Sequence, residues 1–202
     1  MPKIVDHEDR RTQVLEATWR VIQRGGLESA TVREIAREVG YSNGVLAHYF
    51  KDKNEILVQA HRMAFNRVYD RVSQKAGSAK GIELLRTMLY EALPFDEERR
   101  IEAVIDVSFL GRAQYDAELK AARLESAKAA KEWWTEALTR LRADGEIQPD
   151  ADLDVISDTI VALIDGVSVD AVIFPEIMTP ERQVRIADEF VERIRTRTVT
   201  TS

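Results

Sequence analysis

The sequence of 202 residues contains no cysteine, which excludes disulfide bridges and metal sites built from thiolates. No apolar run approaches the roughly 20 residues that a membrane-spanning helix needs. The segment from Met1 to His7 also lacks the apolar centre of a secretion signal. We therefore expect a cytoplasmic protein with no membrane partner. The content of 45% hydrophobic and 32% charged residues fits a globular protein with a substantial buried core.

The signatures of common catalytic sites are missing as well. The three histidines, His7, His48 and His61, do not form a metal-binding motif such as His-Glu-x-x-His. The sequence has no Gly-x-Ser-x-Gly elbow, no phosphate-binding loop and no dinucleotide-binding glycine fingerprint. We therefore predict a protein that is not an enzyme and that carries no metal ion and no cofactor.

Basic residues are fewer than acidic residues, and the net charge is −6. This argues against a protein that coats nucleic acid, because such proteins need a large excess of lysine and arginine. Residues 1–60 carry nine basic and nine acidic side chains, so the whole excess of acid lies in residues 61–202. A neutral N-terminal part joined to an acidic remainder favours a specific, local contact with DNA.

Apolar residues recur at helical spacing along most of the chain, and no segment alternates convincingly with a period of two. The sequence therefore predicts an all-α fold with about nine helices and no strands. Their approximate ranges are 8–24, 31–38, 43–49, 52–76, 78–93, 96–109, 116–143, 151–174 and 180–197.

The first three helices have clear boundaries. Gly25-Gly26 ends the first, because a glycine past the last turn readily takes the left-handed conformation. Thr31 and Glu34 form a capping-box pattern that opens the second helix. Gly40 ends that helix, and Ser42 is a good N-cap for the third. Two short helices joined by a tight turn and packed on a longer one form a helix-turn-helix pattern.

The stretch Tyr41–Lys53 combines several features that suit DNA. Gly44 falls in the first turn of a helix, where glycine costs about 1 kcal/mol relative to alanine. Such a residue is useful where the backbone of another molecule must come close. Asp52 and Glu55 have capping-box spacing and open the next helix. Its N-terminus and the adjacent Lys53 suit a phosphate group.

The block Thr31–Lys53 resembles the DNA-binding domain of the TetR family of transcriptional regulators. The similarity is carried by Thr31-Val32-Arg33-Glu34-Ile35-Ala36, Gly40-Tyr41-Ser42 and Leu46-Ala47-His48-Tyr49-Phe50-Lys51-Asp52-Lys53. The form Ser-Asn-Gly-x-x-x-His-Tyr-Phe-x-Asp-Lys-Asn, from Ser42 to Asn54, is most similar to the BetI-type branch, named for choline-responsive repressors. Strong resemblance covers about residues 8–60.

The resemblance implies a three-helix DNA-binding domain in residues 1–52 and a helical ligand-binding and dimerisation domain in residues 53–202. It implies a regulator, usually a repressor and sometimes an activator, that a small-molecule effector releases from its operator. The expected partners are a second copy of the chain and double-stranded DNA with a pseudo-palindromic operator. The alternative is a helical protein-interaction module without DNA binding, which a salt-sensitive gel shift would distinguish.

Carried across residue by residue, the resemblance makes Asn43–Tyr49 the recognition helix. An asparagine amide can pair with adenine, and small apolar side chains can touch thymine methyl groups. The expected base-contacting residues are Asn43, Gly44, Val45 and Ala47. The expected phosphate contacts, which set position without reading sequence, are Thr31, Ser42, Tyr49 and Lys53. Residues expected to reach either a base or a phosphate are Arg33 and His48.

Simpler roles exist for several of these residues. Thr31 and Ser42 are also explained by helix capping, which does not exclude a phosphate contact. Arg33 and Lys53 would otherwise be ordinary solvated charges. The neighbouring Leu46, Phe50, Ile35 and Val39 are expected in the small core of the N-terminal domain.

Four aromatic residues in the C-terminal part are candidates for an effector pocket: Tyr90, Phe109, Trp133 and Trp134. Aromatic faces attract a quaternary ammonium group by cation–π interaction. Packing in the core is the alternative, particularly for Trp133, which lies on an apolar stripe of its helix. Trp134 is rotated about 100° from that stripe and is expected in another environment.

The predicted helix 151–174 is apolar nearly all round, so it must be covered on several sides. We therefore hypothesise that this helix and helix 180–197 pack against their copies in a second subunit, which makes a four-helix dimer interface. The expected interface residues are Val161, Ile164, Val169, Ile173, Val184, Ala187, Val191 and Ile194.

Overall fold

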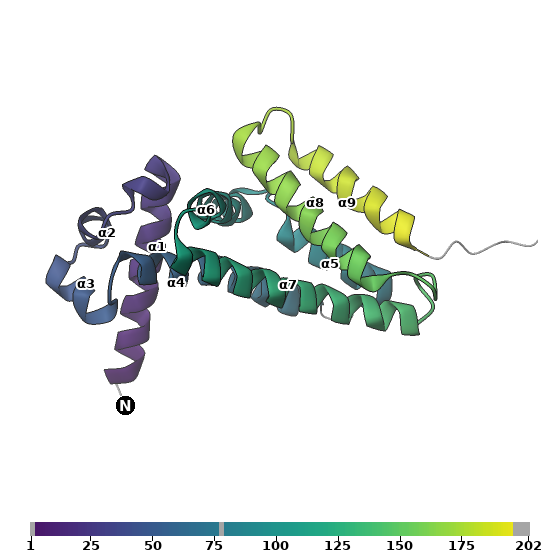
Figure 1. Cartoon of the computed structure of the whole chain (residues 1–202), viewed down its shortest axis with the longest axis horizontal. Coiled ribbons are helices and arrows are strands. Elements are labelled where there is room, and N and C mark those ends of the chain that lie inside the picture. Colours follow the sequence, from purple (N-terminus) through teal and green to yellow (C-terminus); the bar gives the residue numbers. More distant parts are fainter. Residues whose placement is uncertain (1–2, 77–78, 196–202) are drawn as a thin grey trace, which may run out of the picture. The chain divides into compact units, whose positions relative to one another are not determined.

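The computed structural model describes residues 3–76 and 79–195, and within these ranges it contains nine helices and no strand, as the sequence predicts. The helices are α1 (Lys3–Ser29), α2 (Val32–Val39), α3 (Asn43–Tyr49), α4 (Lys53–Ala76), α5 (Gly81–Ala92), α6 (Glu97–Ala113), α7 (Ala117–Ala143), α8 (Leu153–Ile173) and α9 (Pro180–Ile194) (Figure 1). The predicted start of the fifth helix at residue 78 and the predicted end of the ninth at residue 197 lie outside the described residues.

Of the glycines predicted to end the first two helices, Gly26 breaks α1 before its end and Gly40 ends α2. Gly26, with φ 72° and ψ 177°, breaks α1 three residues before its end. Gly40, with φ 79°, is the left-handed C-cap of α2, and its N–H donates to the carbonyl groups of Ala36 and Arg37. Both positions have the positive φ that glycine adopts without steric cost.

The chain divides into two compact units, each built from two separate segments. The first lies within Met1–Arg67 and Ile101–Leu124, and the second lies within Val68–Arg100 and Glu125–Ser202. Helices α4, α6 and α7 therefore each contribute residues to both units. The functional boundary at residue 52 is a separate prediction.

The first unit buries one face of each of its short helices. Ile35 of α2 is 0% exposed, while Leu46 of α3 and the adjoining Phe50 are 1% and 3% exposed, which confirms that these residues form its core. Val39 packs against them in a partly buried position. Trp19 of α1 donates from Nε1 to the carbonyl oxygen of Ala60 at 3.0 Å and so ties α1 to α4.

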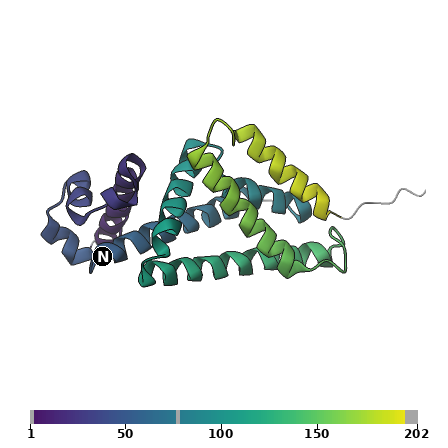
Figure 2. The same cartoon turned by 45° about the horizontal axis from the view of Figure 1, so that its top comes forward.

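The second unit combines an apolar core with a buried ion cluster. Helices α8 and α9 lie side by side (Figure 2). The core of the unit includes Leu85, Leu138 and Ile160. The carboxylate of Glu91, 4% exposed, accepts from Arg99 at 2.6 Å and from Lys75 at 2.8 Å. This cluster joins α4, α5 and α6 within the unit.

Two expectations about the second unit are wrong. The buried tryptophan of α7 is Trp134, 2% exposed, because it lies on the same stripe as Leu138 and Leu141; Trp133 is only partly buried. Ala187 and Val191 of α9 are 0% exposed within their own chain. Since their surfaces are already covered, these two residues are removed from the expected dimer interface.

Candidate DNA-binding site

Helix α3 has one face in the core and one face in solvent. Leu46 and the following Phe50 point inward, as their burial shows. The N-cap, the first residues and the end of the last turn of α3 lie on its solvent-exposed face. The exposed residues are Ser42, Asn43, Gly44, Ala47 and His48, while Val45 and Tyr49 are half-buried. Every residue expected to contact a base therefore has some surface accessible to DNA.

Gly44 is not required by the packing of the protein itself. A Cβ atom built at this position would meet only the Ser42 hydroxyl oxygen, at the ordinary contact distance of 3.8 Å. Its φ angle does not lie in the left-handed region either. The space that glycine leaves is on the exposed side of α3, where the backbone of another molecule would gain from it.

Thr31 and Ser42, the two residues expected to bind phosphate through a hydroxyl group, both cap helices. The Thr31 hydroxyl accepts from the backbone N–H of Glu34 at 3.2 Å, and the Ser42 hydroxyl accepts from that of Val45 at 3.3 Å. Each hydroxyl still has its own hydrogen atom, because capping uses only an oxygen lone pair. Both groups can therefore cap a helix and donate to a phosphate oxygen.

The first turn of α4 is fixed by two carboxylates. Asp52 Oδ1 accepts from the backbone N–H of Glu55 at 2.9 Å, and this bond is the main reason that the pKa of Asp52 is lowered. Glu55 Oε2 reaches back to the backbone N–H of Lys51 at 2.7 Å, one residue before the position that a capping box would use. Lys53 therefore sits on an ordered helix start.

The arginines and lysines of the first unit fall into two groups. On α1 and α2, Arg20 and Arg24 pair with Glu38 at 2.8 and 2.6 Å. The hydrogen bond from Arg24, followed by that from Arg20, lowers the pKa of Glu38 to about 2. In contrast, the side chains of Arg33 and Lys53 have no hydrogen bond or ion pair with any residue that the structure describes. These two cations are the ones that the sequence assigns to DNA.

No role was predicted for Arg11, which the structure places at the junction of α3 and α4. Its guanidinium donates to the carbonyl oxygen of Tyr49, lies 4.5 Å from the centre of the Phe50 ring and reaches Glu55 at 3.4 Å. A carbonyl at a helix C-terminus needs such a donor. Arg11 was missed because these partners are about 40 residues away in sequence, where no local pattern reports them.

Asn54 is a second residue without a role in the sequence-based prediction. Its amide nitrogen donates to Asp116 and to Glu118, each at 3.1 Å. Asp116 also caps α7 by accepting from the backbone N–H groups of Leu119 and Glu118. The first turn of α4, which carries Lys53, is therefore tied to the start of α7 within the first unit.

Comparison with known proteins identifies the family. Residues 14–60 match the family model of the tetR family of bacterial regulatory proteins, and residues 81–196 match that of the C-terminal part of BetI-type transcriptional repressors. The HTH-type transcriptional regulator PksA of Bacillus subtilis is 32% identical over 195 residues, which cover 96% of this chain and 94% of PksA. The chain belongs to the TetR family of transcriptional regulators.

Two further similarities extend along the chain. The HTH-type transcriptional regulator BetI of Vibrio parahaemolyticus is 27% identical over 207 residues, covering 96% of each protein. A transcriptional regulator from Saccharomonospora viridis, solved in complex with choline, has a TM-score of 0.84 and 21% identity, and covers 94% of this chain and 100% of its own. This TetR-family protein is therefore a DNA-binding regulator rather than an enzyme.

The structure brings together only part of the aromatic set expected in this TetR-family chain. The rings of Trp133 and Trp134 are 5.2 Å apart, and Tyr69 of α4, which the sequence did not single out, lies 5.5 Å from Trp133. The Tyr90 hydroxyl donates instead to Asp188 at 2.7 Å. Phe109 belongs to the other compact unit, where it is fully buried and stacks on His61 at 4.3 Å.

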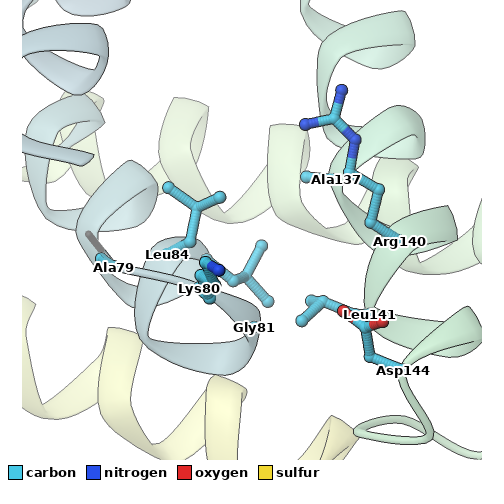
Figure 3. Close-up of a pocket in the computed structure, with 9 residues that line it drawn as sticks. Ala79, Lys80, Gly81, Leu84, Ala137, Arg140, Leu141 and Asp144 are labelled. Atoms are coloured by element: carbon cyan, nitrogen blue, oxygen red, sulfur yellow. The ribbon is translucent and has the colours of Figure 1, made fainter. Parts of the chain in front are cut away.

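A pocket of about 280 Å³ lies in the second unit between the start of α5 and the end of α7 (Figure 3). Its apolar lining comes mainly from leucines on the two helices, and Lys80, Arg140 and Asp144 supply charge. The lining residues are Ala79, Lys80, Gly81, Leu84, Leu85, Ala137, Arg140, Leu141 and Asp144. None of the four expected aromatic residues lines it.

In the part of the chain that the structure describes, no helix is long and apolar enough to cross a membrane. The same residues contain no group of three or more histidine, aspartate or glutamate side chains that could hold a metal ion.

Proposed function

We propose that the chain binds operator DNA through the exposed face of α3, with phosphates held on both sides of that helix. The observation that carries this proposal is the pair of cations, Arg33 and Lys53, that have no partner among the described residues and flank the exposed α3 face in sequence. Asn43, Gly44, Val45 and Ala47 read bases, and Thr31, Ser42 and Tyr49 hold phosphates. His48 reaches a base or a phosphate.

The experiment is a gel shift with DNA from the region upstream of the protein's own gene, repeated over a range of salt concentrations. Replacing Tyr49 with phenylalanine and Lys53 with alanine should weaken binding to specific and unrelated duplexes by similar factors, because phosphate contacts carry no sequence information. The loss of the Lys53 charge should also make the dependence on salt less steep. An unchanged salt dependence after Lys53→Ala would show that Lys53 does not bind phosphate, and unchanged affinity after Tyr49→Phe would show the same for the Tyr49 hydroxyl.

We also propose that the regulator works as a homodimer. The remaining expected interface residues, all at least partly exposed, are Val161, Ile164, Val169, Ile173, Val184 and Ile194. Ile173, Phe174 and Ile177 are exposed by 47–55% at the end of α8 and in the turn that follows. A dimer would present two α3 helices to successive major grooves of a pseudo-palindrome, about 34–36 Å apart or more.

Sedimentation at micromolar concentration should give the mass of two chains, and Ile173→Glu should shift the protein toward one chain. A protein that sediments only at 23 kDa would contradict the dimer.

We propose that residues 1–52 bind DNA and that residues 53–202 bind the effector and the second subunit. This arrangement would allow a small molecule to regulate DNA binding. An effector that prefers a conformation with the wrong spacing of the two α3 helices would shift the population away from DNA. The protein would then be a repressor, and its DNA partner would place it in the cytoplasm.

The choline complex of the Saccharomonospora viridis protein and the match to BetI-type repressors support a quaternary ammonium effector. Tyr69 and Trp133 offer half-buried or exposed aromatic faces to such a cation. Titration with choline should change tryptophan fluorescence and weaken DNA binding. If DNA affinity does not change, choline is not the effector, whatever the fluorescence shows.

A further inference from the structure

One face of α1 converges on a single residue at the end of α3. His7, Arg10 and Arg11 are spaced i, i+3 and i+4, so they lie on the same side of α1. The His7 ring is 4.7 Å from the Tyr49 ring, Arg10 Nη1 is 3.5 Å from the Tyr49 hydroxyl oxygen, and Arg11 donates to the Tyr49 carbonyl oxygen. The first turns of α1 therefore adjoin a residue that the proposed function assigns to DNA.

The chemistry at the end of the Tyr49 side chain suits an anion. Where Arg10 donates to the phenol oxygen, the phenol hydrogen remains to be donated elsewhere. A guanidinium has five N–H groups in a planar fork that matches the oxygens of a phosphate. Tyr49 is half-buried, and Arg10 is only partly covered. A phosphate oxygen at the phenol would thus also lie within reach of the guanidinium.

We propose that Arg10 binds the same DNA phosphate as Tyr49, so that the N-terminal turns of α1 are part of the DNA-binding site. This inference rests on the proposed function of α3, because it requires DNA at Tyr49. The ligand is a phosphodiester of the operator backbone. Arg10 adds affinity at that phosphate and no preference for sequence.

Arg11 has a different role, although it carries the same charge one residue further on. Its guanidinium is occupied by the Tyr49 carbonyl, the Phe50 ring and Glu55. These contacts fix the end of α3 against the start of α4. Arg11 is therefore a positioning residue that holds Tyr49 where Arg10 and the phosphate meet it.

The test compares Arg10→Gln with Arg24→Gln in the full-length protein, on a duplex selected by the wild-type protein from random sequence. Both variants remove one positive charge from α1, but they differ in position: Arg10 lies 3.5 Å from the Tyr49 hydroxyl oxygen, whereas Arg24 pairs with Glu38 of α2 at 2.6 Å. Arg10→Gln should lower affinity about 5- to 10-fold near 0.15 M salt, and the slope of log affinity against log salt should fall by about 0.9 per lost contact. Arg24→Gln should change neither quantity.

Two further variants show whether the phosphate is shared. Arg10→Lys keeps the charge, so it should retain most of the salt slope. Combined with Tyr49→Phe, Arg10→Gln should cost less than the product of the two separate effects, because both residues act on one phosphate. Circular dichroism melting curves check that each variant is folded.

The possible results separate this inference from the function on which it rests. If Arg10→Gln binds like the wild type, or weakens binding with an unchanged salt slope, Arg10 does not bind a phosphate. Fully independent effects of Arg10→Gln and Tyr49→Phe would overturn the shared site. If Lys53→Ala and Tyr49→Phe also bind DNA like the wild type, the proposed DNA-binding surface itself is wrong.

Discussion

Both compact units contain ion pairs between helices, but they differ in how deeply these pairs are buried and in which cations flank an exposed helix face. In the second unit, Arg71 and Arg99 both donate to Glu91, and Arg86 is held by Asp188 and Glu192. In the first unit, Arg33 and Lys53 have no partner among the described residues. Both units therefore use arginines to join their own helices, and in the first unit Arg33 and Lys53, which flank α3 in sequence, are available for a partner molecule.

This difference has a physical basis. A buried arginine needs a carboxylate, because an unpaired charge away from water is costly. A cation binds a phosphate more strongly if it has no carboxylate partner within the chain, because an existing ion pair would have to break before DNA could bind. A carboxylate pair within the chain therefore indicates a cation that helps to hold the fold together, and a cation without such a pair is more readily available for binding.

The largest effect is expected in the second unit, at Glu91. Glu91→Gln removes the charge that three cations share, and removal of one partner from a buried ion pair costs about 3–5 kcal/mol of unfolding free energy. Urea denaturation followed by circular dichroism measures this loss. As a control, Glu136→Gln breaks an exposed pair with Arg140 and should change stability by less than about 0.5 kcal/mol. Equal effects of the two variants would mean that the Glu91 cluster is not a structural element.

The difference in stability between the wild type and Glu91→Gln should depend on pH. Burial acts to raise the pKa of Glu91, but hydrogen bonds from Arg99 and Lys75 outweigh it, so the pKa is lowered from 4.5. A lowered pKa means that Glu91 stabilises the fold above about pH 4.5 and that this contribution is lost as pH falls further. The stability of the wild type and of Glu91→Gln should therefore converge in acid. A constant difference down to pH 3 would contradict this assignment.

The next largest effects concern the division between base and phosphate contacts in the first unit. Asn43→Ala should relax preference at one base position, because a bidentate amide contact discriminates by about 1–3 kcal/mol. Lys53→Ala should instead weaken binding to all duplexes alike. A library of single-base operator variants, measured with both proteins, separates the two patterns. The same pattern in both proteins would remove the distinction.

Gly44→Ala is expected to act in opposite directions on folding and binding. The added methyl group meets no close neighbour in the protein, so helix propensity should raise the unfolding free energy by up to about 1 kcal/mol. DNA affinity should fall, because the methyl group projects from the exposed side of α3. Thermal melting and DNA titration of the same preparation measure both quantities. Unchanged affinity would mean that DNA does not approach this position.

The smallest effect is expected at an exposed ion pair of the first unit. Hydrogen bonds from Arg24 and Arg20 lower the pKa of Glu38 to about 2, and an NMR titration of its side chain should show this. Glu38→Gln should change the unfolding free energy by less than about 1 kcal/mol, since exposed pairs contribute little. A pKa near 4.5 would show that the pair does not persist in solution.

The sequence predicts the N-terminal part better than the rest because its signals are local. Caps such as Thr31 and Ser42 lie within three or four residues of the groups they bind, and the exposed positions of α3 follow from its short amphipathic pattern. The C-terminal part depends on which face of a long helix meets which neighbour. Trp133 and Trp134 are adjacent in sequence, and only the packing of α7 decides that Trp134 is buried.

The same reasoning explains the interface residues that were wrong. Ala187 and Val191 belong to the apolar face of α9. The periodicity of the sequence identifies that face, but it does not show whether the face packs against the same chain or against a second subunit. Arg11 and Asn54 were missed because their partners come from distant segments. Helix boundaries and caps depend on residues that are close in sequence, whereas contacts between helices depend on residues that are far apart in sequence.

We propose above all that the exposed face of α3 reads a DNA sequence. The measurement that tests this is the affinity of the full-length protein for a duplex that the wild-type protein selects from random sequence and for a shuffled duplex of the same length and composition, at about 0.15 M salt. We expect at least about 1,000-fold tighter binding to the selected duplex, and a ratio that falls when Asn43 is replaced with alanine. Equal affinity for the two duplexes, or a ratio that Asn43→Ala leaves unchanged, would contradict it.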